Sequence, residues 1–162
     1  MIERKLNMGK PEKLRHKALI DAAFTMGKTI YDYPLRATYR ILSPQEMSDS
    51  FRLDVPKGIG AVQMLITVPK KKLRHAVDRV TMRRRIREAY RLNRLPLRDA
   101  IEHNPEARSI SIAFIYLHND LTSYANIERK MRNILSKIAA KVDRQLPPTT
   151  DTAGENINPI DN

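Results

Sequence analysis

Cysteine is absent from this chain of 162 residues, which excludes disulfide bonds, thiolate metal sites and cysteine nucleophiles. Long apolar runs are absent too: no segment approaches the roughly 20 apolar residues of a transmembrane helix, and the charged N-terminus lacks the apolar core of a secretory signal. We therefore expect a soluble, cytoplasmic protein. A length of 162 residues suggests one domain with an adequate core.

Side chains that could carry chemistry are also sparse. The four histidines, His16, His75, His103 and His118, lack the spacing of a metal site, and no serine sits in a nucleophile elbow. A metal nuclease needs clustered acids to hold its ions, and the basic part of the chain offers none. The glycines within residues 56–60 predict a turn, because no helix with a Walker lysine follows them. We therefore predict no catalytic residue and no metal site in the protein.

Positive charge is concentrated in one stretch, residues 70–98. The chain has a formal net charge of +12, and this stretch, with three lysines and nine arginines against two acids, carries +10 of it. The remainder of the chain is therefore close to neutral. Concentrated positive charge on one element is typical of a polyanion-binding surface, so we predict a nucleic-acid site here.

The centre of this stretch predicts a helix over residues 79–94. Asp78 is the expected N-cap, the run contains no glycine or proline, and Pro96 indicates a stop or kink just after it. At about 100° per residue, one arc of the helix is apolar and the neighbouring arc carries guanidinium groups. The apolar arc consists of Met82, Ile86, Ala89 and Tyr90, and the guanidinium arc of Arg83, Arg84, Arg87, Arg91 and Arg94. We expect the first arc to pack on a core and the second to bind phosphate.

Other interpretations of this helix stay open. A solvated surface helix usually mixes both signs of charge, whereas the helix offers its five arginines a single acid, Glu88. A DNA-binding module would use residues 79–94 as a recognition helix, but base-edge readout favours Asn, Gln or Ser among the arginines. A structural RNA-binding protein, such as a ribosomal protein or an RNA chaperone, is a further alternative.

The pattern of apolar residues predicts the other elements. Spacings of three and four predict helices over residues 12–26 and 122–145, and Gly27 is the expected C′ residue of the first. Alternation predicts strands over residues 35–42, 51–55, 61–68 and 109–117. After Pro96 the helix continues to about residue 102 and a loop follows.

This order of elements is α-β-β-β-α-β-α, which predicts an α+β fold of two layers with one four-stranded sheet. We expect a single RNA-binding domain over residues 12–145. Residues 1–11 are polar and basic and are expected to be flexible. Residues 146–162 are rich in Pro, Asn and Thr without periodicity and are expected to be disordered.

In combination, these residues resemble the protein component of bacterial ribonuclease P. The resemblance covers roughly residues 12–142 in the same element order. A strand ends in Val68-Pro69-Lys70-Lys71-Lys72, Ala76-Val77-Asp78-Arg79 follows, and the helix then carries Arg83-Arg84 and Ile86-Arg87-Glu88-Ala89-Tyr90-Arg91. Upstream, Ile20, Phe24 and Gly27 match a further family pattern. The chain departs from the family where Val80 and Thr81 replace Asn and Arg of an Arg-Asn-Arg motif, and where Pro69 replaces serine.

The resemblance implies a protein that binds a catalytic RNA and the 5′ leader of precursor tRNA, while the RNA, with magnesium ions that it mainly holds itself, cleaves the phosphodiester bond. It also implies the fold of ribosomal protein S5 domain 2, with a left-handed strand–helix–strand crossover, and no obligate protein partner. Leader contacts are implied for Ile20, Phe24 and Tyr39, in a cleft between the first helix and the sheet. The expected RNA-binding residues are Lys70, Lys71, Lys72, Arg74, Arg79, Arg83, Arg84, Arg87, Arg91 and Arg94.

Overall fold

A computed structural model describes residues 8–144 of the chain. The expected disordered segment, residues 146–162, lies outside this range, as does most of the expected flexible segment at residues 1–11. The last two residues of that segment, Lys10 and Pro11, belong to a short 3-10 helix, η1 (Lys10–Glu12). The Pro11 carbonyl accepts a hydrogen bond of 3.0 Å from the Gly60 amide, so the chain is attached to the domain from this point.

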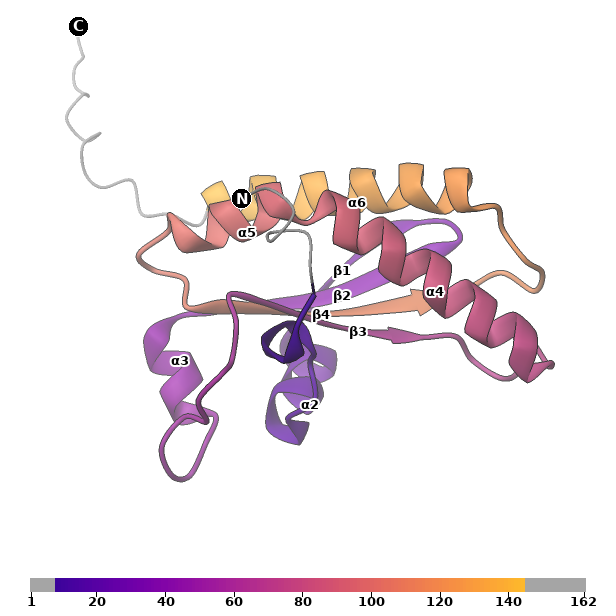
Figure 1. Cartoon of the computed structure of the whole chain (residues 1–162). Helices are drawn as coiled ribbons and strands as arrows, with labels where there is room; N and C mark the ends of the chain where they lie inside the picture. The colour runs from indigo at the N-terminus through magenta and orange to yellow at the C-terminus, as the bar shows by residue number, and fades with distance from the viewer. Residues whose placement is uncertain (1–7, 145–162) are drawn as a thin grey trace, which may run out of the picture.

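A four-stranded mixed sheet forms the centre of the fold (Figure 1). Its strands are β1 (Lys28–Asp32), β2 (Leu35–Leu42), β3 (Val62–Thr67) and β4 (Ser109–Tyr116), in the spatial order β1-β2-β4-β3. The β1–β2 and β2–β4 pairs are antiparallel, whereas β3 and β4 are parallel. Every residue of β4 is buried, which fits a central strand covered on both faces.

Helices lie on both sides of this sheet (Figure 1). On one side are α4 (Ala76–Asn93), α5 (Leu95–Glu102) and α6 (Tyr124–Arg144), and on the other are α2 (Lys17–Met26) and the short α3 (Pro44–Asp49). The α+β class with a four-stranded sheet is confirmed, as is a helix at residues 95–102. Three strands do precede the basic helix, although one of them is not the predicted one.

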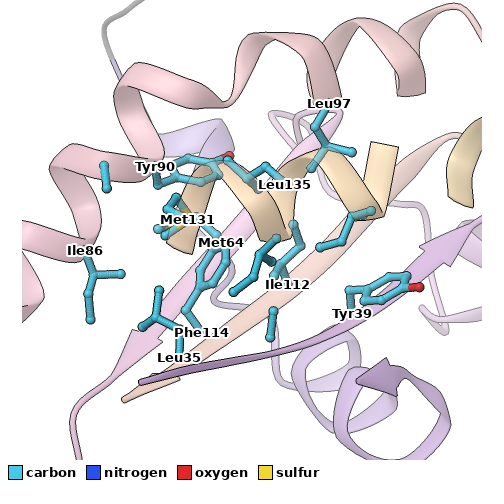
Figure 2. Close-up of a cluster of buried hydrophobic side chains, with 14 of the residues drawn as sticks. Leu35, Tyr39, Met64, Ile86, Tyr90, Leu97, Ile112, Phe114, Met131 and Leu135 are labelled. Carbon is cyan, nitrogen blue, oxygen red and sulfur yellow. The ribbon is translucent and has the colours of Figure 1, made fainter. Parts of the chain in front are cut away.

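The main core lies between the sheet and helices α4–α6. Figure 2 shows Ile86 and Tyr90 of α4 and Met131 and Leu135 of α6 clustered with the inward side chains of the strands, among them Phe114. The predicted apolar arc of the basic helix is confirmed in full, because Met82, Ile86, Ala89 and Tyr90 are all completely buried. A smaller cluster on the opposite face joins Leu14 and Leu19 to Leu42, Met47 and Ile59.

Three local predictions were wrong. The first helix begins at Lys17 rather than residue 12, because the Leu14 amide donates to the Met64 carbonyl and holds the preceding segment extended. Residues 51–55 form no strand, since Leu53 is 88% exposed while Phe51 and Val55 pack on the smaller cluster. The N-cap of α4 is His75, and Asp78 lies in the first turn.

Candidate nucleic-acid interface

The basic helix α4 presents its charged side to solvent because its apolar side is fixed on the core. Arg84 and Arg87 are exposed, and Arg83 is half-buried. The turn before the helix adds Lys70, Lys71, Lys72 and Arg74. Within residues 8–144, none of these seven side chains forms an ion pair with an acid. We call them the cationic face.

Arg79 has a structural contact that the sequence did not reveal. Its Nη1 donates to the carbonyl oxygens of Leu73 and Arg74, at 2.9 and 2.8 Å, and so fixes the turn that carries the lysines against the start of α4. Val80 is 38% exposed beside it, and the Thr81 hydroxyl donates to the Val77 carbonyl. The residues that replace the family's Asn and Arg therefore add no charge to the cationic face.

Arg91 differs from its neighbours because it contacts Glu88, the acid noted in the sequence. Arg91 Nη2 lies 2.7 Å from Glu88 Oε2, with both side chains partly exposed. The hydrogen bond from Arg91 holds the pKa of the Glu88 carboxyl below its usual range. Exposed pairs of this kind are worth about 0–1 kcal/mol, so this pair adds little to stability.

The prediction that Arg94 projects from the guanidinium arc is wrong. Helix α4 ends at Asn93, and the Arg94 side chain turns into the protein, where it is completely buried. Its Nε lies 2.6 Å from Glu12 Oε1, and its Nη1 donates to the Arg91 carbonyl at 2.6 Å. The guanidinium group therefore belongs to a buried ion pair and not to the cationic face.

The second predicted site lies on the other side of the sheet, beside α2. Leu19 and Ala23 are the buried residues of α2 and pack it against the sheet. Phe24 is 48% exposed, and Ile20 is half-buried against the smaller cluster. Gly27 ends α2 in an extended conformation, and a Cβ atom there would lie 2.7 Å from the Tyr39 carbonyl oxygen. Glycine is needed here for close backbone approach, rather than for the left-handed conformation typical of a C′ residue.

Tyr39 does not join Ile20 and Phe24, so that placement was wrong. Successive side chains of a strand point to opposite faces, and Tyr39 packs in the main core on the α6 side of the sheet. Only 2% of it is exposed. The strand residues on the α2 side are its neighbours Thr38 and Arg40.

Two aromatic side chains on β1 and its turn were missed because the strand itself was not predicted. Tyr31 is 63% exposed and Tyr33 is 57% exposed. Tyr31 pairs in register with Arg36 of β2, and both point away from the main core, since Ile30 and Leu35 pack into it. The α2 side of the sheet therefore carries Phe24, Tyr31 and Arg36, which we call the open face.

Few side chains in the part of the chain that the structure describes could bind a metal ion or catalyse a reaction. Residues 8–144 contain no group of three or more His, Asp or Glu side chains that could hold a metal ion. His16 stacks edge-on against Phe51, and His118 Nδ1 lies 2.8 Å from the Tyr33 hydroxyl. None of the described helices is long and apolar enough to span a membrane.

Comparison with known proteins decides the family. A sequence model of the Ribonuclease P family matches residues 8–139. The chain belongs to the bacterial ribonuclease P protein family. Among relatives, the ribonuclease P protein component of Porphyromonas gingivalis (strain ATCC BAA-308 / W83) is 34% identical over 137 residues, which are 83% of this chain and 88% of the relative. That of Chlorobium phaeobacteroides is 35% identical over 114 residues, 68% of this chain and 72% of the relative.

Solved structures agree on the fold. The ribonuclease P protein from Staphylococcus aureus superposes with a TM-score of 0.54 at 17% identity, covering 81% of this chain and 96% of that one. The protein from Thermotoga maritima gives a TM-score of 0.53 at 18% identity, covering 78% and 96%. Family membership gives the chain the role of a protein subunit of ribonuclease P, a tRNA-processing ribonucleoprotein.

Proposed function

We propose that the cationic face binds the catalytic RNA subunit of ribonuclease P. The observation that carries this proposal is the absence of ion pairs to the seven cations of that face within residues 8–144. Such a surface repels itself in the free protein, and phosphate contacts relieve the repulsion and release counterions from the RNA. Arg84 and Arg87 are the most accessible guanidinium groups of the helix, and Lys70 and Lys71 extend the face at its N-terminal end.

The open face is the proposed site of the 5′ leader of precursor tRNA. Single-stranded RNA binds where aromatic rings can stack on bases and cations can track the backbone. Phe24 and Tyr31 offer exposed rings, and the half-buried Arg36 has a buried Nε atom without a hydrogen-bond partner in the described part of the chain. Ile20, in the first turn of α2, adds an apolar contact.

Cleavage of the leader is assigned to the RNA subunit, with magnesium ions held mainly by the RNA. The described residues include no cluster of acids that fits a protein-borne ion, so no step of the proposal depends on one. The protein positions precursor tRNA beside the catalytic RNA and neutralises phosphate charge where the two RNAs approach each other. We place this function in the cytoplasm, with no obligate protein partner.

Precursor-tRNA cleavage by the RNA subunit at low magnesium, with and without this protein, tests the proposal. We expect stimulation by the wild-type protein, and much less by an Arg84→Ala/Arg87→Ala variant that folds normally. Arg98→Ala is the matched control, because Arg98 is paired with Glu102 on α5 and lies outside the cationic face. No stimulation by the folded wild-type protein would favour a structural RNA-binding role instead.

A further inference from the structure

A cavity of about 340 Å³ lies at the edge of the sheet where β1 begins. Lys28, the first residue of β1, pairs with Tyr39, so no strand of the described residues pairs with β2 on this side from Arg40 onward. The last turns of α6 pass over this edge and contribute Lys141 and Arg144 to the wall. The volume lies within the range of about 300–1,000 Å³ that is usual for small-molecule sites.

The charges on the wall of this cavity are unbalanced. Four cations line it, Lys28, Arg40, Lys141 and Arg144, against one acid, Glu46. None of the four side chains forms an ion pair within residues 8–144, and Glu46 already accepts a hydrogen bond from the Ser43 amide at 2.9 Å. An anion in the cavity would relieve the mutual repulsion of the cations.

Tyr39 supplies an independent indication of a ligand. Only 2% of Tyr39 is exposed, yet its hydroxyl has no hydrogen-bond partner in the described chain. Figure 2 shows that hydroxyl pointing away from Ile112 and the other labelled core side chains, and Tyr39 also lines the cavity. An unsatisfied buried hydroxyl is costly. Burial raises the pKa of this phenol, so it stays protonated and can donate to an anion.

We propose that this cavity binds a phosphomonoester, the terminal phosphate of a nucleotide or of an RNA strand, with the Tyr39 hydroxyl donating to a phosphate oxygen. A phosphomonoester carries a charge of about −1.5 to −2 at neutral pH, which suits four cations. An internal phosphodiester carries one charge and needs an open groove for the strand on either side. Met26 and Ile41 supply apolar surface for the attached nucleoside.

This site shares no lining residue with either surface of the proposed function. Met26 and Arg40 reach the cavity from the α2 side, but the open-face residues Phe24, Tyr31 and Arg36 do not line it, and neither do the residues of the cationic face. The inference therefore does not depend on ribonuclease P activity. Arg84→Ala is expected to weaken binding of the RNA subunit and to leave nucleotide binding at this cavity unchanged.

Calorimetric titration of the full chain with AMP and with adenosine tests the proposal. We expect AMP to bind at least tenfold more tightly than adenosine. Tyr39→Phe keeps the packed ring and should weaken AMP binding about tenfold, since a hydrogen bond to a charged group is lost. Lys141→Gln should weaken it as well. Lys137→Gln, one turn earlier on the exposed side of α6 and outside the cavity, is the matched control and should have no effect.

A second arm compares one short RNA with a 5′-phosphate or a 5′-hydroxyl. If the 5′-phosphate improves RNA binding and Tyr39→Phe removes that improvement, the ligand is an RNA end. If the phosphate improves binding of AMP over adenosine but not binding of the RNA, the ligand is a free nucleotide. Both results support the site. Equal affinities for AMP and adenosine would overturn it, as would equal weakening by Lys137→Gln and Lys141→Gln, which would show nonspecific attraction.

Discussion

The Arg94 guanidinium and the Glu12 carboxylate form a two-point contact in the interior of the protein. Nε to Oε1 is 2.6 Å and Nη2 to Oε2 is 3.0 Å, with the Arg94 side chain completely buried and that of Glu12 15% exposed. The Tyr90 hydroxyl lies 3.4 Å from the same carboxylate. This contact attaches η1 to the junction of α4 and α5.

Arg94→Ala should therefore destabilise the protein by about 3–5 kcal/mol, because it leaves the Glu12 carboxylate buried without its partner. Urea denaturation measures the change. A double variant, Glu12→Leu/Arg94→Met, removes both charges and should recover most of the loss. Arg84→Ala is the control for loss of an exposed arginine and should change stability by less than about 0.5 kcal/mol. If Arg94→Ala is equally mild, the buried pair does not hold η1 in place.

Substitutions on the open face should weaken the binding of precursor tRNA alone. Phe24→Ala and Tyr31→Ala are each expected to weaken binding of precursor tRNA to the assembled ribonucleoprotein by about 1–3 kcal/mol, the usual value of one base stacked on an aromatic ring. Affinity for mature tRNA, which has no leader, should not change, and neither should affinity for the RNA subunit. Equal losses for precursor and mature tRNA would place the leader elsewhere.

Glu128 should make stability depend on pH in the acid range. Its carboxylate accepts hydrogen bonds from Asn93 Nδ2 at 3.1 Å and from Arg132 Nη2 at 2.7 Å, and these hold its pKa below the ordinary 4.5. Because the folded-state pKa is depressed, the stabilisation is fully present above pH 4.5 and is lost as pH falls through the folded pKa.

Urea denaturation between pH 7 and pH 3 checks this expectation. Glu128→Gln should show a shallower loss of stability below pH 4.5 than the wild type. Glu106→Gln, which removes an exposed carboxylate elsewhere, should follow the wild-type curve. Parallel curves for Glu128→Gln and wild type would mean that ionisation of Glu128 does not contribute to the loss of stability in this pH range.

The parts of the fold that the sequence predicted well are those with long periodic patterns. Helix α6 buries six apolar side chains at helical spacing. Strand β4 is buried throughout, and large apolar side chains recur at every second position. Both patterns are therefore unambiguous. Strand β1 escaped prediction because it is a short edge strand in which Ile30 is the residue that packs on the main core. Residues 51–55 were wrongly predicted as a strand because their apolar residues alternate in sequence. Phe51 and Val55 pack instead on the smaller cluster, outside the sheet.

The site was predictable where it depends on one helix and unpredictable where it depends on distant partners. The spacing along α4 correctly placed Arg84 and Arg87 on the exposed side. The same spacing failed for Arg94, because the helix ends one residue earlier and Glu12, its partner, is 82 positions away in the sequence. Tyr31 could have been found only by recognising β1, since its exposure follows from pairing with β2.

The salt dependence of binding to the RNA subunit tests the central claim most directly, namely that Arg84 and Arg87 of the cationic face contact RNA phosphates. The slope of log K against log salt concentration should fall by about one unit in each of Arg84→Ala and Arg87→Ala, and remain at the wild-type value in Arg98→Ala. Wild-type slopes in both Arg84→Ala and Arg87→Ala, with folding intact, would contradict the claim and remove the cationic face from the RNA interface.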